Sequence, residues 1–176
     1  MFKFFLNSKV KSYLRGLEKE FGDSTNTIRL ELTRFEKAGL LKSEVIQNRK
    51  YYKANINHLF YSDINSILKK SVGIANVVKY LDEIGEELDA AWITGDIAKG
   101  IDSMIIDLVI IGKDLDYTKL ASVINKIQKG ITRRIRYIVL TDGQMTDYFN
   151  SKPAFCIWEK DNSPTWPQYQ TGDHQS

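Results

Sequence analysis

The sequence predicts an α+β protein built from two modules, because its two halves differ in charge and in hydrophobic pattern. Residues 1–70 carry 14 Lys and Arg against 7 Asp and Glu, a balance of +7, whereas residues 71–176 carry 11 against 15, a balance of −4. The first half has the pattern of helices followed by a hairpin, and the second alternates strands with helices. We therefore expect a basic module that faces a polyanion and an acidic α/β module with a small mixed sheet. On charge alone, Lys and Arg that merely solvate helix faces would explain the first half equally well.

The first module is expected to contain three helices and a hairpin. Hydrophobic spacing and turn residues predict a helix that ends near residue 6, a second over about 13–21, a third over 25–37, and strands at 40–46 and 49–56. The third helix places Ile28, Leu32 and Phe35 on one face, at i, i+4 and i+7. Gln47 and Asn48, between the two strands, are expected to form the hairpin turn.

The opposite side of the third helix carries polar and basic side chains. Asn and Arg are the residues that hydrogen-bond base edges in the major groove, and Thr and Lys suit phosphates. The hairpin turn adds a basic tip that could reach an adjacent phosphate or the minor groove. The predicted DNA contacts are Thr25, Asn26, Thr27, Arg29, Thr33, Arg34, Lys37, Asn48, Arg49 and Lys50. The alternative is that these are only solvated polar positions.

Residues 24–55, which include the block Phe35–Lys42, resemble the recognition helix and wing of ArsR/MarR-like bacterial and archaeal regulators. The resemblance covers about residues 5–70, and the helix before Phe4 is shorter than in relatives. It implies a winged helix-turn-helix that binds double-stranded DNA. Because palindromic DNA usually requires a two-fold symmetric protein, we also expect a homodimer.

A helical connector is expected between the modules. Apolar residues have helical spacing over 59–71 and again over 74–84, and those of the first stretch could pack on the wing or on a second subunit. Further along, strands are expected at 90–94, 105–111, 135–140 and 154–158, with helices at 117–129 and 145–150. The predicted division is a DNA-binding domain at 1–72, the connector at 73–87, an α/β domain at 88–160 and a loosely ordered tail at 161–176.

A second resemblance lies in the α/β domain. The segments Thr94–Gly100 and Ile105–Gly112 look like the minimal nucleotidyltransferase pattern, which is Gly-Ser-x-Ala-Arg-Gly, a loop, then Ser-Asp-x-Asp-Leu on a strand. The resemblance spans about residues 88–141. In that family the Gly-Ser turn holds a nucleoside triphosphate, and the Asp pair, with a third carboxylate on a later strand, holds two divalent metal ions. The matching pocket positions are Gly95, Asp96, Lys99, Gly100 and Asp107.

The chain departs from this pattern at the residues that carry the chemistry. Asp96 replaces the Ser, and the partner of Asp107 in the Asp pair is Ile105 or Val109, depending on register. The later strand offers Arg134 and Arg136 where a carboxylate is wanted. We therefore expect a degenerate domain that is not an enzyme and holds no metal or cofactor. Asp107 would then cap a helix, or pair with Lys99 or with an Arg of the third strand.

The composition excludes several classes of protein and of metal site. A single Cys, Cys156, excludes an intramolecular disulfide and a Cys-based zinc site, and His58 and His174 leave little for a His cluster. No apolar run approaches the ~20 residues of a membrane span, and we expect a cytoplasmic protein. The predicted function is a DNA-binding transcriptional regulator whose second domain serves dimerisation, a protein partner or sensing of a small ligand. The alternatives are an active nucleotidyltransferase and an antitoxin-like partner protein.

Overall fold

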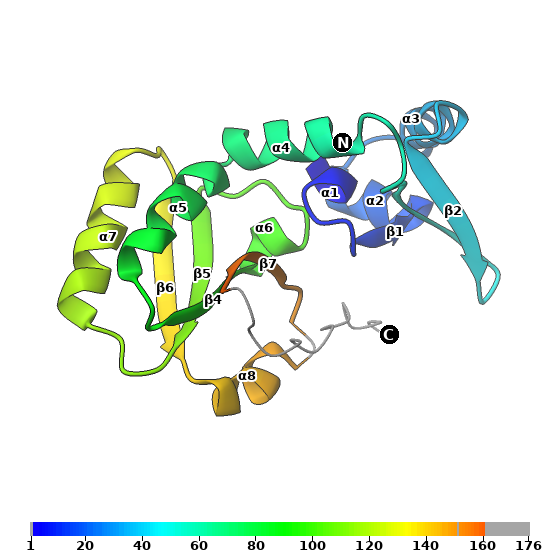
Figure 1. The fold of residues 1–176 in the computed structure, drawn as a ribbon. Coiled ribbons are helices and arrows are strands. Elements are labelled where there is room, and N and C mark those ends of the chain that lie inside the picture. The colour runs from blue at the N-terminus through cyan, green and yellow to red at the C-terminus, as the bar shows by residue number, and fades with distance from the viewer. Residues whose placement is uncertain (1, 151, 161–176) are drawn as a thin grey trace. The chain divides into compact units, whose positions relative to one another are not determined.

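The computed structural model describes residues 2–150 and 152–160, and the chain divides into two compact units, Met1–Ile67 and Leu68–Ser176 (Figure 1). The division falls within the helix that the sequence predicted after the hairpin. The predicted tail at 161–176 lies outside the described residues. Among the residues described, no helix is long and apolar enough to cross a membrane.

The first unit combines three helices with a three-stranded antiparallel sheet. Its elements are α1 (Phe2–Phe5), β1 (Lys11–Tyr13), α2 (Leu14–Phe21), α3 (Thr25–Lys37), β2 (Leu41–Ile46) and β3 (Arg49–Ala54), and α4 (Tyr61–Ser71) follows. The strand order is β1-β3-β2, so β3 is central. Ile28 and Leu32 of α3 are buried together with Leu17 of α2, which places the core between the helices and the sheet.

Local signals fix the bounds of α3 and of the hairpin. The Ser24 hydroxyl accepts a hydrogen bond from the Thr27 backbone N–H, which caps the first turn of α3. Gln47 and Asn48 have φ of 47° and 61°, as a two-residue hairpin turn between β2 and β3 requires. The helix over residues 25–37 and the hairpin turn at 47–48 are therefore found where the sequence predicted them.

One predicted element of this unit is wrong at its start. Residues 11–13 form β1, whereas we expected Tyr13 to belong to the second helix, which in fact begins at Leu14. The cause is a pairing distant in sequence, because Lys11 and Tyr13 lie opposite Lys53 and Tyr51 of β3. Phe21, the last residue of α2, is 54% exposed.

The second unit contains a four-stranded mixed sheet. Its elements are α5 (Ile74–Leu81), the 3-10 turn Asp82–Ile84, β4 (Leu88–Thr94), α6 (Gly95–Ala98), β5 (Ile105–Gly112), α7 (Tyr117–Lys129), β6 (Arg134–Leu140), α8 (Asp142–Phe149) and β7 (Phe155–Glu159). The strand order is β6-β5-β4-β7, with β5 and β6 parallel and the other neighbours antiparallel. The small mixed sheet that the sequence predicted is thus confirmed.

Helices pack against this sheet. On one face Met145 and Phe149 of α8 pack against Trp92 and Val109 in a buried cluster. Helices α5 and α7 pack against each other and lie beside the strands in Figure 1. Further along the first face, Thr94, Asp107 and Arg136 stand opposite one another on β4, β5 and β6, because residues directly opposite in register point to the same side.

Candidate functional site

The outward side of α3 carries several exposed polar side chains. Asn26, Arg29 and Lys37 are exposed, and none of their side chains has a polar partner within residues 2–150 and 152–160. Leu30, on the same side, is 59% exposed, so the stripe has an apolar centre. Such a combination can hydrogen-bond base edges, contact a thymine methyl group and meet phosphates.

Other predicted contacts on α3 are held by local hydrogen bonds. The Thr25 hydroxyl donates to Glu18, the hydroxyls of Thr27 and Ser24 are 2.9 Å apart, and the Thr33 hydroxyl donates to the Arg29 carbonyl. Arg34 pairs with Glu31 one turn earlier, and both are well exposed. The bonds of Thr25 and Thr27 hold the first turn of the helix. Asn26, Arg29 and Lys37 are the exposed side chains of this side without a polar partner among the residues described.

Two basic residues of the hairpin β2–β3, the predicted wing, have contacts within their own unit. The Arg49 guanidinium carbon lies 5.3 Å from the centre of the Tyr13 ring. The Lys50 ammonium donates to Glu36 of α3 at 2.8 Å, and the Ser43 hydroxyl donates to the same carboxylate. The hydrogen bond from Lys50, followed by that from Ser43, lowers the pKa of Glu36, and the same bond raises the pKa of Lys50.

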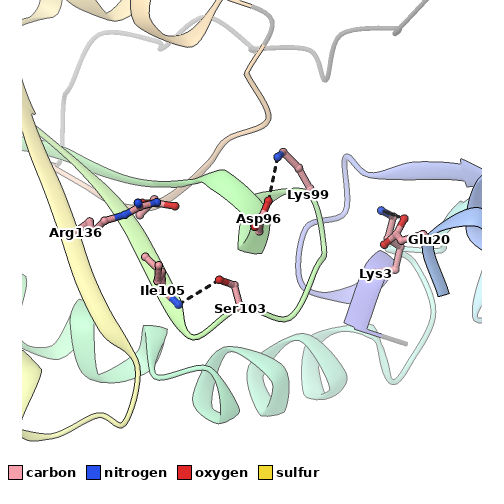
Figure 2. Close-up of polar contacts among 8 residues, drawn as sticks. Lys3, Glu20, Asp96, Lys99, Ser103, Ile105 and Arg136 are labelled. Carbon is pink, nitrogen blue, oxygen red and sulfur yellow. Dashed lines mark hydrogen bonds and ion pairs between the residues drawn. The ribbon is translucent and has the colours of Figure 1, made fainter. Parts of the chain in front are cut away.

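Gly95 and Asp107 define the second candidate site. Gly95 has φ of +67°, and a Cβ at this position would lie 2.1 Å from Oδ2 of Asp107, so only glycine fits. Oδ1 of Asp107 accepts a hydrogen bond from Nε of Arg136 at 2.7 Å, and Nη2 of the same guanidinium lies 2.7 Å from Oδ1 in an ion pair. Lys99 pairs with Asp96 at 3.0 Å instead (Figure 2). Of the partners that the sequence left open for Asp107, the structure selects the arginine of the third strand.

The two metal ions implied by the nucleotidyltransferase resemblance do not fit the side chains present. Asp107 is a single carboxylate, and one of its oxygens already faces the Arg136 guanidinium. Ile105, which replaces the first aspartate in one of the two registers, contributes a backbone N–H bonded to the Ser103 hydroxyl (Figure 2). In the described part of the chain, no group of three or more His, Cys, Asp and Glu residues is arranged to hold a metal ion.

Two solved structures resemble part of this chain. One contains the toxin–antitoxin pair MntA–HpeT in a mutant form; the match has 14% identity and a TM-score of 0.40, and covers 49% of this chain and 73% of that one. The other is "a putative nucleotidyltransferase from Sulfolobus solfataricus", with 18% identity, a TM-score of 0.37, and coverage of 53% and 89%. No protein-family model matches the chain, and no curated protein matches it.

These comparisons contradict the expectation that the protein is not an enzyme. A structure described as "a putative nucleotidyltransferase" is among those similar to it, and the expectation rested only on carboxylates missing from a sequence pattern. We therefore withdraw the assignment as an inactive domain. Neither structure is described as a DNA-binding regulator, so DNA binding and homodimer formation stay predictions.

Proposed function

We propose that residues 1–72 form a winged helix-turn-helix that binds double-stranded DNA, and that the protein is a transcriptional regulator. The observation that carries this proposal is the outward stripe of α3, where Asn26, Arg29 and Lys37 are exposed while Ile28 and Leu32 are buried on the opposite side. A helix that follows a tight turn and presents such a stripe suits the major groove.

In this proposal each part of the first unit has a separate task. The N-terminal turn of α3, capped by Ser24, enters the groove, so that Asn26 and Arg29 meet base edges. Lys37, at the other end of the helix, meets a phosphate and contributes affinity that does not depend on sequence. Asn48, at the turn between β2 and β3, is the wing residue assigned to the backbone of the DNA.

The test is binding of the full chain to DNA fragments recovered by genome-wide pull-down, followed by fluorescence anisotropy. Arg29→Ala should cost about 1–3 kcal/mol on the selected site and relax its specificity, because one base contact is lost. Arg134→Ala, which removes the same charge from an exposed position on β6, is the matched control and should bind like the wild type. Equal affinities of the Arg29→Ala variant and the wild type would remove α3 from the interface.

Dimerisation through α4 and the loop before it belongs to the same proposal. Ile56, Leu59, Phe60 and Ile67 are large apolar residues that are each more than half exposed. Large apolar side chains exposed within one short segment are typical of protein–protein contacts. A second copy of the chain would cover them and double the number of base contacts on a two-fold site. The second unit then offers its surface to a protein partner or to a small ligand.

Nucleotidyl transfer by the second unit is the second candidate function. It is favoured by the position of Asp107, which lies against the positive-φ turn at Gly95 at the end of β4. The test is incubation of the full chain with each radiolabelled nucleoside triphosphate, with Mg²⁺ or Mn²⁺, and with protein and nucleic acid acceptors. Label transfer that Asp107→Asn abolishes would support an enzyme. Transfer that survives this substitution would assign the activity to a contaminant.

A further inference from the structure

The sheet of the first unit has a face turned away from the helices, and its composition is unusual. Tyr52 and Ala54 of β3 are buried, so the alternating residues of that strand point to the other side. The strand register adds their neighbours on β1 and β2 to the same side. The outer sheet face then comprises eight residues: Lys11, Tyr13, Lys42, Glu44, Ile46, Arg49, Tyr51 and Lys53.

Two tyrosines form the centre of the outer sheet face. The rings of Tyr13 and Tyr51, on neighbouring strands, meet edge to face with their centres 5.3 Å apart. Each carries a cation above it: Lys11 lies 5.7 Å from the centre of the Tyr51 ring, and Arg49 lies 5.3 Å from that of Tyr13. The two rings therefore lie together with the Arg49 guanidinium and the Lys11 ammonium against them.

The charge of this face is mainly positive. Lys11, Lys42, Arg49 and Lys53 lie on it, and the acidic residue of the same side, Glu44, pairs with Lys53 at 3.3 Å. The face is separate from the outward side of α3, because Glu36 of α3 bonds to Ser43 and Lys50, which point to the opposite side of this sheet. The proposed binding of a duplex by α3 therefore does not involve these cations and rings.

We propose that the outer sheet face binds single-stranded nucleic acid, in addition to the duplex binding proposed for α3. Lysines spaced over three adjacent strands fit a phosphate backbone, and Tyr13, Tyr51 and the guanidinium of Arg49 offer planes on which bases stack. A duplex is the poorer occupant, because its paired and stacked bases cannot reach the rings. A protein partner fits less well, since charged groups surround the two rings at the centre of the face.

The size of the outer sheet face determines the length of the oligonucleotide used to test it. A strand of six residues such as β3 is about 20 Å long, which suits a few nucleotides. Fluorescein-labelled dT15 and rU15 are therefore long enough to cover it, and neither forms a duplex with itself. Binding to the full chain is followed by fluorescence anisotropy and should weaken steeply with salt, as expected for contacts between lysine and phosphate.

Substitution of Tyr51 separates stacking from charge. Tyr51→Leu keeps an apolar side chain of similar bulk but removes the ring, and it should weaken dT15 binding about 5- to 150-fold. Tyr51→Phe keeps the ring and should bind within about twofold of the wild type. Circular dichroism and the thermal midpoint establish that both variants are folded. If Tyr51→Leu does not fold, Tyr13→Leu with Tyr13→Phe makes the same comparison on the neighbouring strand.

Arg29→Ala on α3 distinguishes this proposal from the duplex proposal. It should weaken binding to the selected duplex and leave dT15 binding unchanged, whereas Tyr51→Leu should do the reverse. Absence of dT15 and rU15 binding at about 50 μM protein in low salt would overturn the single-strand proposal. So would equal affinities of folded Tyr51→Leu and Tyr51→Phe, or displacement of dT15 by any duplex at equal concentration. None of these outcomes affects the duplex proposal.

Discussion

Substitution of Gly95 by alanine probes the close approach of the second unit's turn to Asp107. Gly95 has φ of +67°, and an alanine there costs about 1–2 kcal/mol from the left-handed backbone alone. Its Cβ would also lie 2.1 Å from Oδ2 and 3.3 Å from Cβ of Asp107, a contact that forces the carboxylate away. Overpacking of this kind costs about 1–3 kcal/mol more, so we expect Gly95→Ala to destabilise the unit by about 2–5 kcal/mol.

Urea unfolding followed by tryptophan fluorescence measures this loss selectively. The tryptophans of the described residues, Trp92 on β4 and Trp158 on β7, belong to the second unit. Gly22→Ala is the control for the backbone term, since Gly22 has φ of +70° and a Cβ added there would meet no atom within 4 Å, so its cost should stay near 1–2 kcal/mol by circular dichroism. Asp107→Ala in the Gly95→Ala background should restore about 1–3 kcal/mol by removing the clash.

Two results would refute this reasoning. If Gly95→Ala costs no more than Gly22→Ala, the carboxylate does not lie against the glycine in solution. If the loss persists unchanged after Asp107→Ala is added, the strain comes from another neighbour of Gly95. Either result would also remove the observation that favours a functional pocket at this turn.

Two further predictions concern the first unit. Glu36→Gln should flatten the fall in stability between about pH 7 and pH 3, because the lowered pKa of Glu36 gives stability that is present above its unfolded pKa and lost as pH falls through the folded value. The effect should stay below about 1 kcal/mol, since Lys50 and Glu36 are only partly buried, and urea unfolding at several pH values measures it. Replacement of Leu59 and Phe60 by serine should reduce the mass seen by light scattering from that of a dimer to about 20.3 kDa. A wild type already at 20.3 kDa would refute dimerisation.

The elements that sequence predicts well are those with local signals. The cap at Ser24 and the turn at Gln47–Asn48 are written in adjacent residues, and α3 and the hairpin accordingly lie where they were expected. The segment Lys11–Tyr13 has no such signal. It becomes a strand because it pairs with Tyr51–Lys53, about forty residues away, and periodicity alone assigns Tyr13 to the helix that follows.

The contacts of the candidate site depend on register in the same way. The sequence left Asp107 with several possible partners, because it does not say which residue of the third strand stands opposite. The parallel pairing of β5 and β6 places Arg136 there and leaves Lys99 to Asp96. A sequence motif therefore identifies the residues near a turn. Which charged side chain forms an ion pair with Asp107 follows only from the strand register.

The contacts of Lys37 and Lys50 predict how each lysine affects the salt dependence of duplex binding. The excess of basic residues in the first unit suggests that each wing cation meets a phosphate. However, Lys50 donates to Glu36, whereas Lys37 has no polar partner among the residues described.

Each phosphate contact contributes about 0.9 to the slope of log K against log salt concentration. Lys37→Ala should thus reduce the slope for duplex binding by about 0.9, and Lys50→Ala should leave it unchanged. The two variants lose the same charge, so the long-range field changes equally and only direct contacts differ. An equal reduction for Lys50→Ala would mean that Lys50 leaves Glu36 for the DNA, and that the wing binds the backbone as the sequence alone predicted.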